Sequence, residues 1–360
     1  MNIRAQIRML PDNRRLHMHD GPIDLIVEAF GRPMDIKAAY RAAAQRFPTV
    51  LDELCEELKF LRQPTRPDGP LPQGPIARRM VAAVTPYAAT TFITPMAAVA
   101  GAVAEEILGI MTHAAELSRA YVNDGGDIAL HLGPGERFVV GMMEYPRPEA
   151  IALPRELARY TFPNSPVFLC APRGSSSLST SNGTPRSEYE LQRNTLFGTT
   201  TLDFTHPVRG IATSGWRGRS FSLGIADAVT VLADTAAQAD AAATVIANAV
   251  DLPGHPAVVR IAANELQPDT DLADRPVTQG VGELRLDEIH AALSAGAQVA
   301  DQLRRQGLIR AAALNLQSET RLVGRRNFGL DEYPVESIRF GKGTASAVPI
   351  GATSDGGFSR

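Results

Sequence analysis

Apolar residues recur at helical spacing in a long segment near the start of the chain. Within residues 34–61, apolar positions recur at spacings of three and four residues, at Leu51, Leu54, Cys55, Leu58 and Leu61. This stripe predicts a helix that packs one face on a core. Apolar periodicity or a high alanine content predicts further helices over 76–84, 96–120, 236–249 and 287–305. Thr94 and Pro95 are typical of an N-cap followed by proline at the first helical position.

Shorter apolar segments between these helices predict strands. Residues 16–31 indicate two strands around a Gly-Pro turn, and 208–213 and 229–233 indicate two more. His17 and His19 alternate with apolar residues, so both would lie on one strand face. Such a pair could hold a metal or a phosphate, although a structural role is the commoner one.

Two segments lack any sustained period. Residues 63–75 hold five prolines and two glycines, which predicts a loop. In residues 163–206, 21 of 44 positions are Pro, Gly, Ser or Thr, which favours a mobile insertion over a domain. We therefore expect a single domain over 1–327, interrupted at about 163–206, and an irregular, partly disordered tail over 328–360.

The overall composition excludes several classes of protein. Lys and Arg number 36 against 39 Asp and Glu, so no basic excess favours nucleic acid as a partner. No run of about 18 apolar residues predicts a membrane span, and the N-terminus lacks the pattern of a signal peptide. The two cysteines, Cys55 and Cys170, are too distant in sequence to suggest a zinc site or a disulfide framework. These features predict a soluble cytoplasmic protein.

Three short segments combine backbone freedom with polar side chains. In the first, Asn123, Asp124, Gly125, Gly126 and Asp127 place paired glycines between carboxylates. Glycines there permit positive φ and a close approach of a ligand, and the carboxylates could orient a ribose or a cation. A plain turn is an equally good interpretation, because Asn, Asp and Gly are the ordinary turn residues.

The second segment, 210–220, surrounds the single tryptophan of the chain. Thr213, Ser214 and Gly215 precede Trp216, and Arg217 and Arg219 follow it. The arginines could hold phosphate by forked hydrogen bonds while the indole stacks on a planar ring. The alternative is an exposed hairpin tip.

In the third segment, Asp240 and Thr244 lie four residues apart on a predicted helix and therefore share one face. A carboxylate and a hydroxyl suit a hard cation such as magnesium, which completes its coordination with water and phosphate. Without further support, Asp240 near the start of a helix is more simply explained by the helix dipole.

The order of these motifs resembles that of the ApbE superfamily of flavin transferases. It is closest to a branch that carries the sequences found here at residues 94–104 and 209–228. The resemblance covers roughly residues 10–155 and 208–320. It implies an α/β (α+β) fold, with a mixed sheet covered by helices.

The same resemblance implies a function. ApbE-type enzymes cleave FAD with magnesium and transfer FMN to a Thr or Ser of a target protein. The resemblance assigns the metal to Asp240 and Thr244 and the flavin region to Gly125, Gly126 and Asp127. We expect Asn123, Thr213, Gly215 and Trp216 to complete the ligand site, and Ser214, Arg217 and Arg219 to act in catalysis. The expected partners are a nucleotide-like small molecule and a protein acceptor, with neither nucleic acid nor membrane.

The sequence also departs from the pattern of the enzymes. Ala100 stands where the enzymes usually have lysine, and Glu105 where they have aspartate. No histidine occurs among the thirteen residues between Gly215 and Val229. The alternative is therefore a binding or accessory protein that keeps the fold and has lost the groups for FMN transfer.

Overall fold

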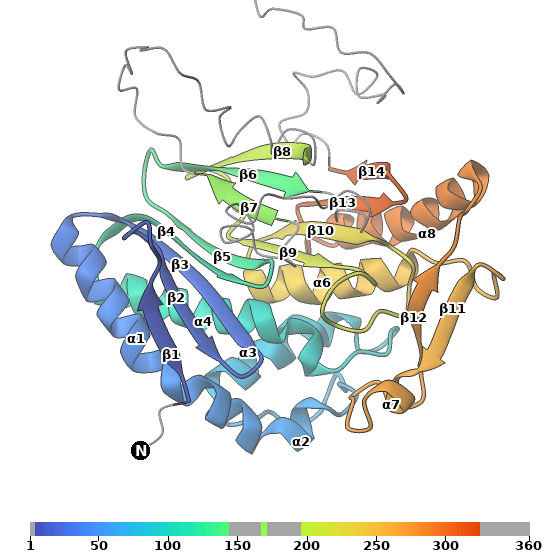
Figure 1. Cartoon of the computed structure of the whole chain (residues 1–360), viewed down its shortest axis with the longest axis horizontal. Coiled ribbons are helices and arrows are strands. Elements are labelled where there is room, and N and C mark those ends of the chain that lie inside the picture. The colour runs from blue at the N-terminus through green and yellow to red at the C-terminus, as the bar shows by residue number, and fades with distance from the viewer. Residues whose placement is uncertain (1–3, 144–166, 171–195, 325–360) are drawn as a thin grey trace, which may run out of the picture.

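The computed structural model describes residues 4–143, 167–170 and 196–324. Its centre is a nine-stranded sheet with the strand order β1-β2-β3-β4-β5-β9-β10-β13-β14 (Figure 1). These strands are β1 (Gln6–Met9), β2 (Leu16–Asp20), β3 (Ile23–Gly31), β4 (Leu117–Asp124), β5 (Asp127–Leu132), β9 (Gly210–Ser214), β10 (Ala228–Ala233), β13 (Ala311–Leu316) and β14 (Glu319–Val323). Every described pairing in this sheet is antiparallel.

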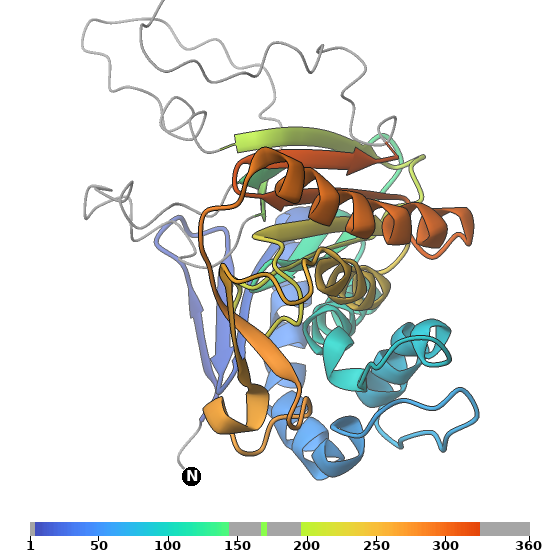
Figure 2. The ribbon, with the colours of Figure 1, turned by 90° about the vertical axis from the view of Figure 1, so that its right-hand side faces the viewer.

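Helices cover one face of this sheet (Figures 1 and 2). They are α1 (Pro33–Glu56), α2 (Leu58–Leu61), α3 (Pro75–Val84), α4 (Val99–Ala114), α6 (Ala236–Ala249) and α8 (Leu286–Arg305), with the 3-10 turns η1 (Thr85–Tyr87) and η2 (Pro95–Ala98). Their apolar faces form one core with the sheet, in which Phe47, Ile107 and Val231 are fully buried. Burial of this apolar surface is the main driving force for the layered arrangement.

A small second sheet covers the opposite face. It has the order β7-β6-β8, from β6 (Arg137–Met143), β7 (Val167–Cys170) and β8 (Leu196–Asp203). Phe138, Val140 and Leu202 pack from it against Ile128 and Ile211 of the large sheet. The central strands are consequently covered on both faces. A further two-stranded sheet pairs β11 (Val258–Ala262) with β12 (Pro276–Val281). The short helix α7 (Ala263–Leu266) begins directly after β11.

The structure confirms the predicted fold class, most of the predicted helices and the four predicted strands. The helix expected over 96–120 is too long, because α4 ends at Ala114 and residues 117–124 form β4. No glycine or proline marks this boundary, and six of the eight residues of β4 are buried, so the strand lacks the alternation of a half-exposed one. The expectation of a mixed sheet is also wrong, since the described pairings are antiparallel.

Several strands have no sequence pattern that predicts them. All six residues of β13 are buried, so this strand lacks the alternation that marks a half-exposed one. Strands β7 and β8 fall within 163–206, so parts of the predicted insertion belong to the small sheet. Residues 163–166 and 171–195 of that range, and the predicted tail at 328–360, lie outside the described residues.

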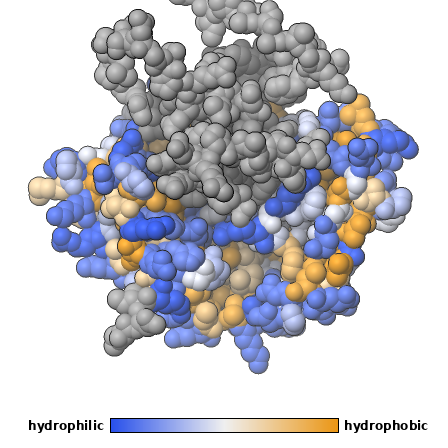
Figure 3. Space-filling model, viewed as in Figure 1, coloured by the Kyte–Doolittle hydropathy of each residue, from blue (hydrophilic) through white to orange (hydrophobic). Residues whose placement is uncertain are grey.

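The described surface offers no single large apolar face. Exposed large apolar side chains are dispersed over several elements; they are Met9, Met34, Leu71, Phe204, Val259, Leu266 and Leu286. Figure 3 shows hydrophilic side chains over most of the described part of one face, with apolar ones in separate groups. The stretch Pro95–Ala114 has the length and hydropathy of a membrane span, but half of its most apolar part is buried in the fold, as in a core helix.

Two glycines fix the position of the α6 N-terminus. A Cβ on Gly101 of α4 would lie 2.4 Å from the carbonyl oxygen of Ala236, and a Cβ on Gly210 of β9 would lie 2.0 Å from that of Thr235. Thr235 is the N-cap of α6, and its hydroxyl accepts the Gln238 N–H at 3.3 Å. The start of α6 is therefore held between β9 and α4, with backbone in contact on both sides.

Candidate functional site

The first predicted segment forms the hairpin turn between β4 and β5. Asp124 and Asp127 face each other at the ends of the two strands, and Gly125 and Gly126 adopt φ of +63° and +121°. Positive φ at both central residues is the requirement of a tight two-residue hairpin, and glycine meets it without strain. The Asn123 side chain accepts the Gly126 N–H at 2.9 Å. In this structure Asn123 therefore supports the turn.

The second segment lies beside this hairpin, because β9 pairs with β5. The Thr213 N–H donates to Oδ1 of Asp127 at 3.1 Å, while the Thr213 hydroxyl pairs with that of Thr230 at 2.9 Å. Thr213 thus holds Asp127 through its backbone. Ser214 ends β9 half-buried, and its hydroxyl has no hydrogen bond in the described part of the chain.

The third segment brings Asp240 of α6 to the same end of the sheet. Its Oδ2 accepts the Gly101 N–H at 3.0 Å, at the start of α4. In return, Oε1 of Glu105 on α4 accepts the Ala237 N–H at 2.8 Å, at the start of α6. Each helix therefore provides the carboxylate that satisfies an end amide of the other.

Asp124, Asp127 and Asp240 form a group that we call the acidic cluster. Burial raises the pKa of Asp124 to about 7, although the Arg219 guanidinium opposes the shift. Burial also raises the pKa of Asp127 well above its ordinary value, and the negative charge of Asp240 adds to the effect. The pKa of Asp240 is raised by burial and by the charge of Asp124, against the Gly101 N–H. The three carboxylates thus disfavour one another's ionisation.

The two arginines of the second segment have different partners. Arg217 donates from Nε to Oδ1 of Asp227 at 2.6 Å, and its guanidinium carbon lies 4.6 Å from the centre of the Trp216 ring. Arg219 instead extends to the acidic cluster, where its Nη2 lies 3.7 Å from Oδ1 of Asp124. Of the two, only Arg219 is therefore placed to serve a ligand at the cluster.

Asp227 anchors the loop that carries these arginines. Besides Arg217, its carboxylate accepts the indole N–H of Trp216 at 3.1 Å and the Gln317 N–H at 2.7 Å. Gly215 adopts φ +156°, and a Cβ there would lie 2.5 Å from the Asp227 carbonyl oxygen. Trp216, Arg217 and Gly215 consequently belong to the support of the loop.

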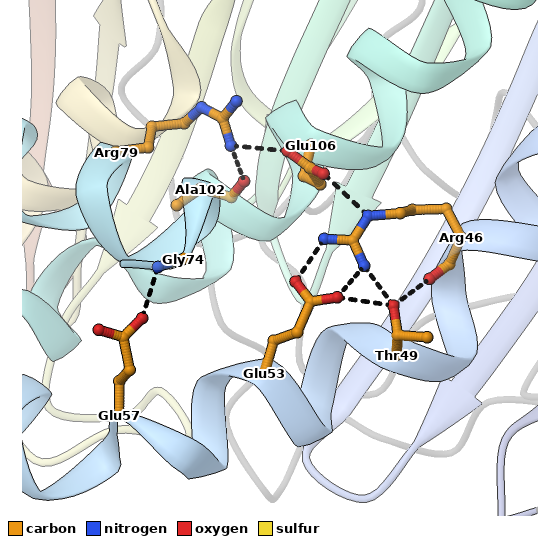
Figure 4. A network of polar contacts seen from close by, with 8 residues as sticks. All are labelled: Arg46, Thr49, Glu53, Glu57, Gly74, Arg79, Ala102 and Glu106. Carbon is orange, nitrogen blue, oxygen red and sulfur yellow. Dashed lines mark hydrogen bonds and ion pairs between the residues drawn. The ribbon is translucent and has the colours of Figure 1, made fainter. Parts of the chain in front are cut away.

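A second group of charges, two arginines and three glutamates joined by short ion pairs, lies between the helices. We call Arg46, Glu53, Arg79, Glu105 and Glu106 the helix network. Glu106 lies between the guanidinium groups of Arg46, at 2.9 Å, and Arg79, at 3.2 Å (Figure 4). Arg79 also pairs with Glu105 at 3.0 Å. This network joins α1, α3 and α4 to the N-terminus of α6, and so supports the helix that carries Asp240.

The donor set of the acidic cluster suits a hard divalent cation. Carboxylate oxygens with few counter-charges are the ligands that magnesium prefers, and it needs only one or two from the protein when phosphate and water supply the rest. Thr244 lies one turn after Asp240, half-buried, and its hydroxyl has no hydrogen bond within the described residues. In those residues, no three or more His, Cys, Asp or Glu side chains converge as a metal-binding group. Any cation there would accordingly take much of its coordination from a ligand.

His17 and His19 do lie on one strand face, but they have other partners. His17 contacts Oδ1 of Asp24 at 2.5 Å through Nε2, and its Nδ1 accepts from Arg8 at 3.2 Å. His19 lies 3.7 Å from the same carboxylate. With both ring nitrogens of His17 engaged, the structural interpretation is the better one.

Sequence reasoning missed part of this arrangement. It noted Asp124 in the turn without including it in the site, and it treated Glu105 only as a departure from a motif. The contacts of Glu105 and Gly101 with α6 join residues more than 130 positions apart, and no local pattern could indicate them.

A comparison with known families gives one match. The family model described as AbpE bacteria matches residues 7–162 and 177–322, which include the whole acidic cluster and Arg219. Among curated proteins, none matches the chain.

Proposed function

Since the chain belongs to the family described as AbpE bacteria, we propose that it binds FAD, or a related ligand with a planar ring and a diphosphate, together with a divalent cation at the acidic cluster. The observation that carries this proposal is that Asp124, Asp127 and Asp240 are near enough for their charges to raise the pKa values of Asp127 and Asp240, although the three do not converge on one point. These carboxylates come from two distant segments, and within the described residues the nearest guanidinium, that of Arg219, makes only a long contact. Such an imbalance favours an external cation.

We further propose that this family is a branch of the ApbE superfamily. The motif order in the sequence supports this, as does the placement of all three motifs at one end of the sheet. Asp240 and Thr244 would hold magnesium with Asp127 beside them. The cation would screen the charge of a diphosphate. Arg219 would bind phosphate oxygens, and the Ser214 hydroxyl would position the ligand.

The reaction that this resemblance implies is FMN transfer. The diphosphate bond of FAD breaks, the FMN phosphorus bonds to a Thr or Ser oxygen of an acceptor protein, and AMP leaves as the hydroxyl proton is lost. Ser214, Arg217 and Arg219 were the candidate catalytic residues. The engagement of Arg217 by Asp227 and Trp216 leaves Ser214 and Arg219 as the better candidates.

A second function, binding without turnover, is favoured by the contacts of Asp227. This carboxylate lies in the loop where the enzymes usually carry their histidine and aspartate, and three donors occupy it. A carboxylate so engaged is a poor general base. In that case the protein would be a flavin-binding accessory protein. The cytoplasmic location stays a prediction from the sequence.

One incubation separates these functions. Purified protein is mixed with FAD and Mg²⁺, and AMP, protein-bound flavin and free FAD are measured. Release of AMP or flavin attached to an acceptor supports transfer, whereas tight FAD binding without turnover supports the accessory function. If FAD neither binds nor raises the melting temperature, both flavin functions are wrong.

A matched pair of variants tests the cation site. Asp240→Asn is expected to remove Mg²⁺-dependent FAD binding, because it takes a charge from the cluster. Asp234→Asn is the control, since Asp234 lies just before α6 and pairs with Arg310 away from the cluster. Full Mg²⁺ dependence in Asp240→Asn would overturn the assignment.

A further inference from the structure

The guanidinium of Arg219 lies directly against the hairpin turn. A Cβ on Gly125 would be 1.9 Å from Nη2 of Arg219 and 2.7 Å from its central carbon. Any side chain at position 125 would thus displace the arginine. Gly125 serves two purposes: it permits φ +63°, and it leaves the space that Arg219 occupies.

The bond between Arg219 and the cluster is weak for a buried partner. Asp124 has a side chain only 5% exposed, yet the nearest arginine nitrogen is 3.7 Å away, beyond a good hydrogen bond. The Arg219 side chain is 44% exposed, so part of its guanidinium faces solvent. A long, half-exposed ion pair contributes little and is easily exchanged.

Arg219 is also the cation nearest to the cluster in the described structure. It acts on both Asp124 and Asp127, favouring their charged forms, but does not compensate their burial. Arg217, by contrast, is committed to Asp227 and Trp216. The two neighbouring arginines therefore provide a loosely paired charge and a closely paired one on the same loop.

We propose that Arg219 is an internal counter-cation of the acidic cluster, which a divalent cation displaces and which then binds the anionic part of the ligand. This inference rests on the proposed function and adds an order of events to it. Arg219 and the divalent cation repel each other at the cluster, because each like charge a few ångströms away opposes the binding of the other. Arg219 and a diphosphate attract each other.

The consequence is that one substitution shifts two affinities in opposite directions. Arg219→Gln removes the competitor, so the dissociation constant for Mn²⁺ alone should fall about tenfold. The same variant removes a phosphate contact, so the dissociation constant for FAD with Mg²⁺ should rise about tenfold. A variant that only damaged the fold would weaken both.

The experiment measures Mn²⁺ binding by electron paramagnetic resonance and FAD binding by quenching of Trp216, the only tryptophan of the chain. Arg217→Gln is the matched control and should leave the Mn²⁺ affinity within about twofold, because Arg217 pairs with Asp227 instead. Gly125→Ala is the second test. It keeps the charge of Arg219 but moves it off the turn, and should also strengthen Mn²⁺ binding.

The outcomes separate this inference from the proposed function. The unmodified protein could bind Mn²⁺ and FAD while Arg219→Gln leaves the Mn²⁺ affinity unchanged or weaker. In that case Arg219 does not compete with the cation for the cluster, and the proposed function stands. If Arg219→Gln strengthens the binding of both Mn²⁺ and FAD, the displacement of Arg219 by the cation is supported and the contact of Arg219 with phosphate is wrong. If the unmodified protein binds neither Mn²⁺ nor FAD, the proposed function fails and this inference with it.

Discussion

The acidic cluster and the helix network both include a carboxylate that joins α4 to α6, yet their charges are compensated differently. In the helix network, Glu106 has a guanidinium on each side at 2.9 and 3.2 Å. In the acidic cluster, three carboxylates have one arginine, at 3.7 Å from the nearest. The first arrangement satisfies its charges within the chain, whereas the second leaves negative charge to be satisfied from outside.

The effect on pKa values has opposite signs in the two regions. Burial alone would raise the pKa of Glu53, but hydrogen bonds from Arg46 and Thr49 outweigh it and lower the pKa. Burial raises the pKa of Asp124 to about 7, and Arg219 does not offset it. The difference agrees with our proposal that the acidic cluster binds a cation, whereas the helix network holds the helices together.

The pH dependence of stability should give the largest effect. Asp124 binds its proton more tightly in the folded state, so its stabilising effect is present below its ordinary pKa of 3.8 and is lost as pH rises through about 7. The rise in the pKa of Asp124 from 3.8 to about 7 is roughly three tenfold steps in proton affinity. This sets an upper limit on the order of 4 kcal/mol for the loss of unfolding free energy. We expect metal-free protein with a chelator to lose stability from pH 5 to pH 8.

Urea unfolding at both pH values measures this loss, and added Mg²⁺ should reduce it at pH 8. Glu53 has the reverse sign: its contribution is present above its ordinary pKa of 4.5 and is lost as pH falls below it. The helix network therefore cannot cause a loss on the alkaline side. Equal stability at pH 5 and pH 8 would contradict the assigned charge imbalance.

Substitution in the helix network should give the next largest effect. Glu106→Ala leaves Arg46 and Arg79 without their shared carboxylate, and Arg46 and Glu106 are only 16% and 11% exposed. Breaking such a pair should cost about 3 kcal/mol of unfolding free energy. Glu53→Ala is the control: its side chain is 37% exposed, so about 1 kcal/mol is expected. Equal losses of unfolding free energy in Glu106→Ala and Glu53→Ala would show that Glu106 contributes no more to the network than Glu53 does.

Removing a carboxylate from the acidic cluster should stabilise the fold, in contrast to the loss expected in the helix network. Asp124→Asn keeps the shape of the side chain and relieves repulsion from Asp127 and Asp240. The metal-free protein at pH 8 should become about 1–2 kcal/mol more stable, as measured by urea unfolding. A loss of similar size would mean that the Arg219 contact outweighs the repulsion.

The smallest effect on stability is expected at Thr244. Its hydroxyl has no hydrogen bond in the described part of the chain, so Thr244→Val should change the unfolding free energy of metal-free protein by less than about 0.5 kcal/mol. The same variant should weaken Mn²⁺ binding if the hydroxyl is a metal ligand. Thr213→Val is a useful contrast, because that hydroxyl pairs with Thr230 and its loss should destabilise the fold.

Local patterns in the sequence were sufficient for much of the fold. The alanine-rich helix at 236–249, the helix ending at 305 and the hairpin at 16–31 follow from spacing and turn residues, and the structure has them within one or two positions. The strand β13 did not follow, because burial on both faces removes alternation. The boundary between α4 and β4 was misplaced for the same reason.

The sequence by itself determined which residues are the candidates for the site: the Gly-Gly turn between aspartates, the arginines beside Trp216, and Asp240 on its helix. Only the tertiary structure decided how they act. Pairing of β5 with β9 and the close contact of Gly101 with α6 bring the three carboxylates together. The same packing places Arg219 on Gly125 and commits Arg217 to Asp227. Charge interactions depend on distance in space, and adjacent positions such as 217 and 219 can differ in role when only one reaches the cluster.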